Sequence, residues 1–145
     1  MATRKLGFSA LLTAVYARLT TYELTKSYKF YNDVPMNAAK PYHVIGKPMG
    51  KKSDEFSNRD SQAEDNVFQI DSHVDEMGGR GDKAIADMMN NIMQALTSSP
   101  LSITGYYSPF ILQIEYADVM KDTTEPSSYD RHGIMRFRVH MAPSS

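Results

Sequence analysis

The chain has 145 residues, 41% of them hydrophobic and 23% charged, which is ordinary for one globular domain. Sixteen basic and seventeen acidic residues give a net charge of −1. That balance argues against a nucleic-acid-binding module, which depends on a basic excess or a clustered basic face. The sequence contains no cysteine, so disulfides, thiolate metal sites and cysteine nucleophiles are excluded.

The first 24 residues, MATRKLGFSALLTAVYARLTTYEL, have a basic start and an apolar part broken by polar side chains. The apolar residues recur at helical spacing, which predicts an amphipathic helix ending near Thr20 and no signal peptide. Its core-facing residues are Leu6, Leu11, Leu12, Val15 and Leu19. No stretch approaches the ~20 apolar residues of a membrane span, so we expect assembly in the cytoplasm and no membrane partner.

Two β-prone stretches come next in the chain. KSYKFYNDVP (26–35) is rich in aromatic residues, but Pro35 limits its continuation as a strand. PYHVIG (41–46) begins with a proline and ends with a glycine, and we predict a short strand there.

A polar segment, GKPMGKKSDEFSNRDSQAED, occupies residues 46–65 and predicts a long mobile loop, because it has too few apolar residues to bury. Its start resembles a P-loop, but Gly46 and Gly50 are separated by three residues instead of four, and no helix follows. A flexible basic loop that contacts an acidic neighbour is the better interpretation. The candidate contact residues are Lys47, Lys51 and Lys52.

Residues 66–74, NVFQIDSHV, alternate and predict a half-exposed strand. One side carries Phe68, Ile70, Ser72 and Val74, and the other carries Val67, Gln69, Asp71 and His73. The pair of Asp71 and His73 on one face is compatible with acid–base chemistry, but polar residues on a solvated or interface surface are the favoured interpretation.

A glycine-rich stretch, HVDEMGGRGDKA (73–84), contains a G-x-G-x-x-A pattern and an overlapping Arg-Gly-Asp. A dinucleotide loop would follow a nearly all-apolar strand, and the acidic residues around these glycines would repel a pyrophosphate. We therefore predict a plain turn into a helix, with Asp82 as the N-cap. The Arg-Gly-Asp match is interpreted as chance.

The following segment predicts a second helix that Pro100 stops shortly after its end. Its apolar stripe consists of Ile85, Met88, Met89, Ile92, Met93 and Leu96. The chain has ten methionines, and those of this stripe are more simply core filler than a dedicated binding surface.

Two alternating strands, 110–117 and 133–141, end the chain. Their predicted inward residues are Phe110, Leu112, Ile114 and Tyr116 on the first strand, and Met135, Phe137, Val139 and Met141 on the second. The outward residues Arg136, Arg138 and His140 would lie opposite Gln113 and Glu115, forming cross-strand pairs and a surface suited to another subunit. The polar linker, 118–130, is long for a hairpin and is predicted to be mobile and to protrude.

These elements predict an α+β domain covering residues 1–145. A largely antiparallel sheet of about four strands carries two helices packed on one face, in the order α-β-β-α-β-β. The four histidines are scattered without metal-ligand spacing, and no nucleophile motif accompanies them. We therefore expect no enzyme activity, no cofactor and no metal.

The chain resembles the small tail completion proteins of long-tailed bacteriophages, also called tail terminators or tail-to-head joining proteins. The resemblance covers nearly the whole chain. It includes the first helix, YNDVPMNAAKPYHVIG (31–46), FQIDSHV (68–74), KAIADMMNNIMQAL (83–96) and DRHGIMRFRVHM (130–141). The segments 21–29 and 46–65 are longer than the family's usual connections.

The resemblance implies a structural virion protein without enzymatic activity, located in the phage tail or neck. Proteins of this family form a ring, typically of six copies, that caps the head-proximal end of the tail tube and joins it to the head connector or stopper, with DNA only passing through. Candidate assembly contacts here are the three lysines of the 46–65 segment together with Arg136 and Arg138. Two alternatives remain: another neck or minor tail component such as a connector stopper, and a small nucleotide-binding enzyme that uses a glycine loop.

Overall fold

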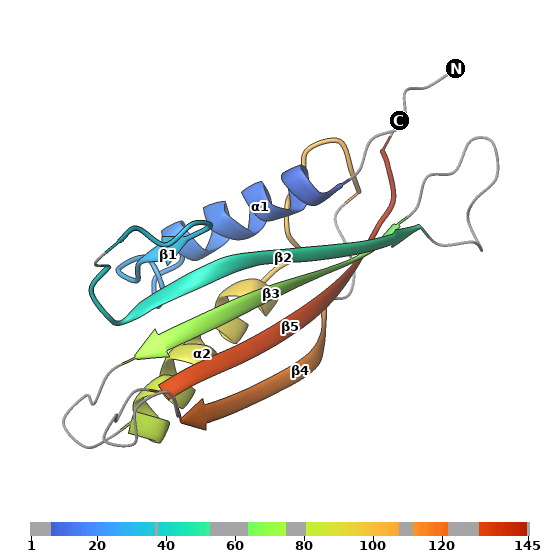
Figure 1. The fold of residues 1–145 in the computed structure, drawn as a ribbon. Coiled ribbons are helices and arrows are strands. Elements are labelled where there is room, and N and C mark those ends of the chain that lie inside the picture. The colour runs from blue at the N-terminus through green and yellow to red at the C-terminus, as the bar shows by residue number, and fades with distance from the viewer. Residues whose placement is uncertain are drawn as a thin grey trace.

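The computed structural model describes residues 7–36, 38–52, 64–74, 81–107, 112–121 and 131–144. The fold has two layers, a five-stranded sheet and two helices on one of its faces (Figure 1). The elements are α1 (Phe8–Thr21), β1 (Phe30–Tyr31), β2 (Tyr42–Lys52), β3 (Glu64–Val74), α2 (Gly81–Thr97), β4 (Leu112–Lys121) and β5 (Arg131–Met141). The predicted α+β class is confirmed.

The strand order in the sheet is β1-β2-β3-β5-β4. The pairs β2–β3, β3–β5 and β4–β5 are antiparallel, whereas the two residues of β1 pair parallel with His43 and Val44 of β2. The prediction of four strands in the order α-β-β-α-β-β is therefore wrong by one strand. The aromatic stretch 26–35 contributes only a two-residue parallel bridge, which has no periodicity for a sequence pattern to detect.

The strands extend into both segments predicted as mobile loops. β2 continues to Lys52 and β3 begins at Glu64, so only residues 53–63 of the predicted loop 47–65 lie outside the described residues. Likewise β4 continues to Lys121, and residues 122–130 of the predicted loop 118–130 lie outside them. Backbone pairing between neighbouring strands does not require apolar side chains, which is why the polar composition of these segments did not predict their strand structure.

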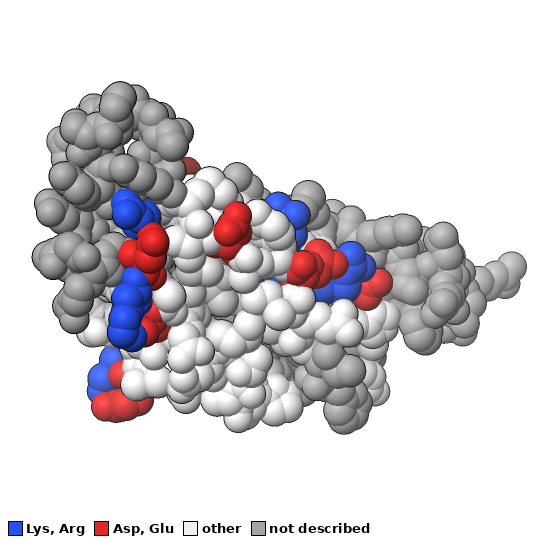
Figure 2. Space-filling model, turned by 90° about the horizontal axis from the view of Figure 1, so that it is seen from below, with Lys and Arg blue, Asp and Glu red and all other residues white. Residues whose placement is uncertain are grey.

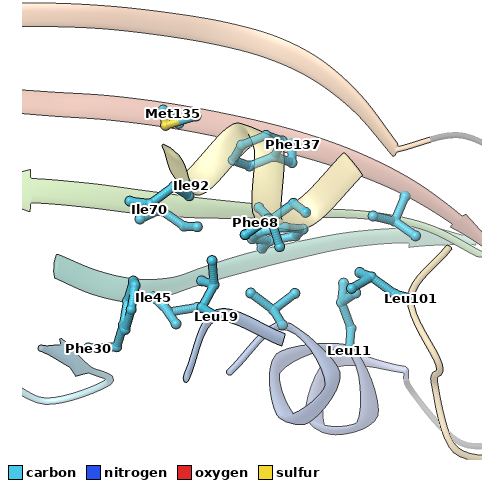
Figure 3. Packing of buried hydrophobic residues seen from close by; sticks show 14 of the residues in the cluster. Leu11, Leu19, Phe30, Ile45, Phe68, Ile70, Ile92, Leu101, Met135 and Phe137 are labelled. Atoms are coloured by element: carbon cyan, nitrogen blue, oxygen red, sulfur yellow. The ribbon is translucent and has the colours of Figure 1, made fainter. Parts of the chain in front are cut away.

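The core lies between the helices and one face of the sheet. Phe68 of β3 stacks on Phe137 of β5 with ring centroids 5.1 Å apart, and Ile92 of α2 and Ile70 of β3 belong to the same buried cluster (Figure 3). The predicted inward residues of β5, namely Met135, Phe137, Val139 and Met141, are all buried. On α1 the predicted stripe is confirmed for Leu11, Val15 and Leu19, and on α2 for Ile85, Met89, Ile92 and Leu96.

On β4 the predicted inward face is only partly right. The register shifts between Ile114 and Tyr116, so Glu115 is an extra residue in this strand. Such a bulge reverses the side-chain alternation beyond it. Tyr116 therefore lies opposite Arg136 on the uncovered face of the sheet instead of facing inward, whereas Leu112 packs against the core as predicted. Phe110 lies outside the described residues.

Arg18 of α1 forms a contact that helical periodicity did not predict. Its guanidinium donates hydrogen bonds to the carbonyls of Ala95 (3.0 Å), Ser99 (3.0 Å) and Pro100 (3.1 Å), and to Ser98 Oγ (3.2 Å). The carbonyls at the end of a helix have no partner within that helix. Arg18 thus provides hydrogen-bond donors for the carbonyls at and just beyond the end of α2, and these bonds link α1 to α2.

Replacing Arg18 by alanine should destabilise the domain by about 1–3 kcal/mol, because several carbonyl acceptors lose a charged donor at once. Urea unfolding of the purified chain measures this difference. Arg18→Lys is the matched control, since an ammonium keeps the charge but lacks the planar fork of donors, and its loss should be intermediate. Equal stability of wild type and Arg18→Ala would show that the contact contributes nothing.

Candidate assembly surface

Among the described residues, one face of the sheet carries no helix. By register it contains Tyr42 and Val44 of β2, the odd-numbered residues of β3, the even-numbered residues of β5, and Gln113, Tyr116 and Asp118 of β4. We call this surface the open face. Isolated apolar residues are normal on a protein surface, but the open face instead presents ordered rows of aromatic and charged side chains that cross several strands.

An aromatic row crosses the open face near one end of the strands. Tyr31, Tyr42, His73 and His132 follow one another from β1 to β5, with successive ring centroids 6.1, 5.0 and 4.4 Å apart. The last two rings are stacked with only 16° between their planes. Rings in mutual contact lose little further freedom when a partner covers them, so the row is a preorganised contact surface.

A polar network occupies the middle of the open face. Gln69 Nε2 donates to Asp71 Oδ1 (2.9 Å), and His132 Nε2 lies 3.1 Å from the same oxygen. Arg136 Nη2 donates to Gln69 Oε1 (3.1 Å), and its guanidinium carbon lies 5.7 Å from the centre of the Tyr116 ring. Arg136 thus spans three strands and is held by contacts on both sides.

Arg138 lies in a second charged row towards the other end of the strands. It forms ion pairs with Asp65 of β3 (3.6 Å) and with Glu115 of β4. His140 Nδ1 lies 2.7 Å from Asp65 Oδ1. The structure confirms the predicted positions of these residues. Arg136, Arg138 and His140 lie on one face of β5, and Gln113 and Glu115 of β4 lie beside them. Because acids of neighbouring strands pair with these cations, the face presents no broad cationic field.

The prediction that β3 is half-exposed is wrong. Gln69 and Asp71 on its open side are only 5% and 9% exposed. β3 is the central strand of the sheet, and Arg136 and His132 of β5 contact Gln69 and Asp71 from one side. Sequence alternation identifies which residues share a face, but it does not show how far neighbouring strands cover them.

The open face also sets the ionisation of Tyr116. Its hydroxyl donates to Asp118 Oδ2 (3.1 Å), and this hydrogen bond, together with the negative charge of Asp118, raises the pKa of the Tyr116 phenol. The phenol therefore stays a neutral donor. It offers no activated base for catalysis.

The basic candidates of the 46–65 segment occupy a different part of the sheet. The second half of β2 contains all three lysines. Lys47 lies within the register shift between Gly46 and Met49, and Lys51 and Lys52 follow that shift. Gly46 is level with Gln69 and Arg136, and Met49 with Val67 and Arg138, so the lysines and the arginines are level along the strands but lie on β2 and β5, with β3 between them. The five candidate contact residues therefore form two groups and not one cluster.

The glycine-rich stretch has no chemistry in the part that the structure describes. α2 begins at Gly81, so Asp82 is in its first turn and is not the N-cap that the sequence predicts. Its carboxylate instead receives a hydrogen bond from Arg131 Nε of β5 (2.6 Å). An acid at this position repels a phosphate from the helix start. Residues 75–80 lie outside the described residues.

Within the described ranges, no three acidic or histidine side chains gather closely enough to hold a metal ion. Neither described helix has the length and apolar content that crossing a bilayer requires. A groove of about 460 Å³ runs between α2 and β4. Its walls are mainly apolar and include Met89, Met93, Ile114, Ala117 and Val119, so it is suited to contact with another apolar surface and not to polar catalysis.

This α+β fold is shared with phage-type virion proteins. The chain is similar to a chain in the virion of a native gene transfer agent particle, with a TM-score of 0.75 and 17% identity over 96% of this chain and 99% of that chain. It is also similar to the gp17 protein of bacteriophage SPP1, with a TM-score of 0.58 and 23% identity over 96% of this chain and 94% of that protein. No protein-family model and no curated protein sequence matches the chain.

Proposed function

We propose that this chain is a structural component of a phage-type virion that caps the head-proximal end of the tail tube and joins tail to head as a ring of copies. The observation that carries the proposal is the likeness of the entire fold to a chain of an assembled virion, at a TM-score of 0.75 over 96% of the chain. The resemblance of the sequence to tail completion proteins supports the same role. The proposed partners are further copies of the chain, the tail tube protein and the head connector or stopper.

Features of the molecule agree with a role in assembly. Its charged side chains on the open face pair with one another, and the rings of its aromatic row are in mutual contact. A subunit that contacts several protein neighbours needs such surfaces, because preformed side-chain contacts lower the entropy cost of association. Arg136 and Arg138 are therefore proposed as contact residues of the open face. Lys47, Lys51 and Lys52 are proposed as contact residues of the β2 end.

Shortening the β2–β3 connection tests this function. Residues 53–62 would be replaced by a brief glycine–serine link, which leaves both strands intact because β2 ends at Lys52 and β3 begins at Glu64. We expect a folded chain but particles in which heads and tails fail to join, or tails of irregular length, as counted by electron microscopy of lysates. Lys26→Ala, which changes only an exposed ion pair with Glu23, is the control and should leave joined particles unchanged.

Normal joining with the shortened connection would show that this segment does not contact the tube or the connector. Position in the particle separates the alternatives. Gold labelling of an epitope-tagged chain should mark the junction of head and tail, whereas labelling elsewhere on the tail would identify a minor tail component. Absence from purified particles combined with micromolar nucleotide binding would identify the enzyme alternative.

A further inference from the structure

We infer that the outer edge of β4, with the apolar groove beside it, is the site where the β2 end of a second copy of this chain docks. The contact is head-to-tail, so each copy offers its β4 edge to one neighbour and its β2 edge to the other. This inference rests on the proposed ring. It adds which surfaces meet.

The β4 edge is long and partly apolar, although it has a bulge at Glu115 and carries the charged residues Glu115, Asp118 and Lys121. β4 is the last strand in the sheet order, and among the described residues no strand lies on its outer side. Edge strands of monomeric proteins are usually short, or carry prolines, charged side chains or bulges that hinder pairing. β4 has ten residues and no proline, and it exposes Ile114 and Tyr116 (42% each) and Met120 (39%). The part of the strand beyond the bulge, residues 116–120, is therefore suited to receive another strand.

The groove gives this edge an apolar floor on the helix side. Ile114, Ala117 and Val119 of β4 line it from one side, and Met89 and Met93 of α2 from the other. Seen from below, the surface has a broad uncharged area, while charged side chains, including acids near the middle of the view, lie above it and to its left (Figure 2). Methionines adapt their shape to an incoming side chain. The groove can therefore hold apolar side chains of a neighbour whose backbone pairs with β4.

The other edge of the same sheet is the matching surface. β1 pairs with β2 only at His43 and Val44, and in the described part of the chain no strand lies beside β2 beyond Val44 on that side. α1 lies along the earlier part of β2, and the end of β2 extends past it (Figure 1). That end contains Lys47, Lys51 and Lys52. The molecule thus has one open edge on each side of one sheet.

Direction and charge favour pairing between unlike edges. Three antiparallel steps separate β2 from β4, so the two strands run in opposite directions. Two copies in the same orientation therefore place β4 antiparallel to the neighbour's β2. Glu115 lies between Ile114 and Tyr116, which are level across β5 with Phe68 and Gln69 of β3. Gln69 in turn pairs with Gly46 of β2. Glu115 is therefore level with the start of the β2 end that contains the lysines.

Pairing of β4 with β4 is disfavoured. It would bring the acids Glu115 and Asp118 of both copies together at one seam, and like charges on paired strands are destabilising. It would also form a closed pair, whereas a head-to-tail contact repeats and can close into a ring. The second copy therefore presents β2.

Cross-linking of the full chain tests the inference, because the chain has no cysteine of its own. Gln113→Cys on β4 and Lys51→Cys on β2 would be prepared as separate proteins, mixed, and treated with a short bis-maleimide. We expect cross-linked pairs between the two variants. We expect far fewer from Gln113→Cys alone, or from Lys51→Cys mixed with the control Met36→Cys, a position that is 91% exposed.

A groove variant provides the second measurement. Sedimentation of the wild-type chain should show association that increases with concentration up to about 1 mM, the range of weak protein contacts. Ala117→Arg, which places a long cation in the groove, should abolish association and cross-linking, whereas Met36→Arg should change neither. Circular dichroism confirms that each variant is folded.

Several results would overturn the inference. They are a wild-type chain that stays monomeric at every concentration, a mixture of Gln113→Cys and Lys51→Cys that forms no cross-linked pairs, self-cross-linking of Gln113→Cys at the level of the mixture, and unchanged association of Ala117→Arg. Labelling of the chain at the head–tail junction is measured independently. A chain found at that junction but not paired through β4 would leave the proposed function standing and place the subunit contact elsewhere.

Discussion

Ile92→Asp is expected to unfold the domain or to destabilise it by more than about 4 kcal/mol, a large part of the stability of a domain of this size. Ile92 has no exposed surface and lies in the middle of α2. Its side chain is part of the buried cluster between this helix and the sheet (Figure 3). A carboxylate there would be buried without a partner, and the apolar contacts would be lost as well. The measurement is the urea midpoint, or circular dichroism if the variant does not fold.

Gln94→Asp is the matched control for this substitution. Gln94 is exposed on the same helix, so the same new charge stays in water there. It should cost only a few tenths of a kcal/mol, up to about 1 kcal/mol, from the unfavourable position of an acid near the end of a helix. Similar midpoints for the two variants would show that the apolar side of α2 does not face the sheet.

The stability of the domain is expected to fall as the pH drops from about 6.5 towards 4, by up to about 3 kcal/mol from His43 alone. Burial, with a smaller contribution from the charge of His73, lowers the pKa of His43 from 6.5 to about 4. The ring stacks against Tyr28 and lies close to Phe30, and its Nδ1 is 2.7 Å from Ser72 Oγ. These neighbours accommodate the neutral imidazole and provide no acid for the charged form.

The direction of the pH effect follows from proton binding. Below pH 6.5 the unfolded chain binds a proton at residue 43 while the folded chain does not, so protonation favours unfolding. The contribution is fully present above 6.5 and is lost as the pH falls towards about 4. Urea unfolding at several pH values measures it. Nuclear magnetic resonance of the imidazole reports the titration directly.

His43→Gln is the control because glutamine does not titrate. The variant should be less stable at neutral pH, since it loses the aromatic contacts, but its stability should depend less on pH between 6.5 and 4. Equal pH dependence in the variant and the wild type would show that carboxylates or other histidines cause the acid sensitivity. An imidazole that titrates near 6.5 in the folded chain would also contradict the burial argument.

The polar side chains of the open face are bonded mainly to one another. On the open face, Asp71 lies within hydrogen-bond reach of both Gln69 and His132, and Arg138 lies between two acids. Groups held in this way are already committed to one another. Their arrangement stabilises a defined surface, which agrees with the proposed role of a subunit that contacts other proteins.

Hydrophobic periodicity alone was sufficient for much of the fold. It predicted α1 to within one residue of its end at Thr21, and it predicted the buried stripe of α2 and the inward residues of β5. It also placed Arg136 and Arg138 together on the opposite face. These features depend on local spacing, because a side chain's direction in a helix or strand is set by its position within that element.

Other features were decided only by the tertiary structure. The bulge at Glu115 moves Tyr116 to the open face, and Arg18 satisfies carbonyls more than 75 residues away in the chain. The central position of β3 buries polar residues that alternation would leave in water. Each depends on which segments become neighbours, and the extension of β2 to Lys52 likewise depends on a partner strand. Local sequence determines the faces of each element, whereas strand order and register determine what those faces meet.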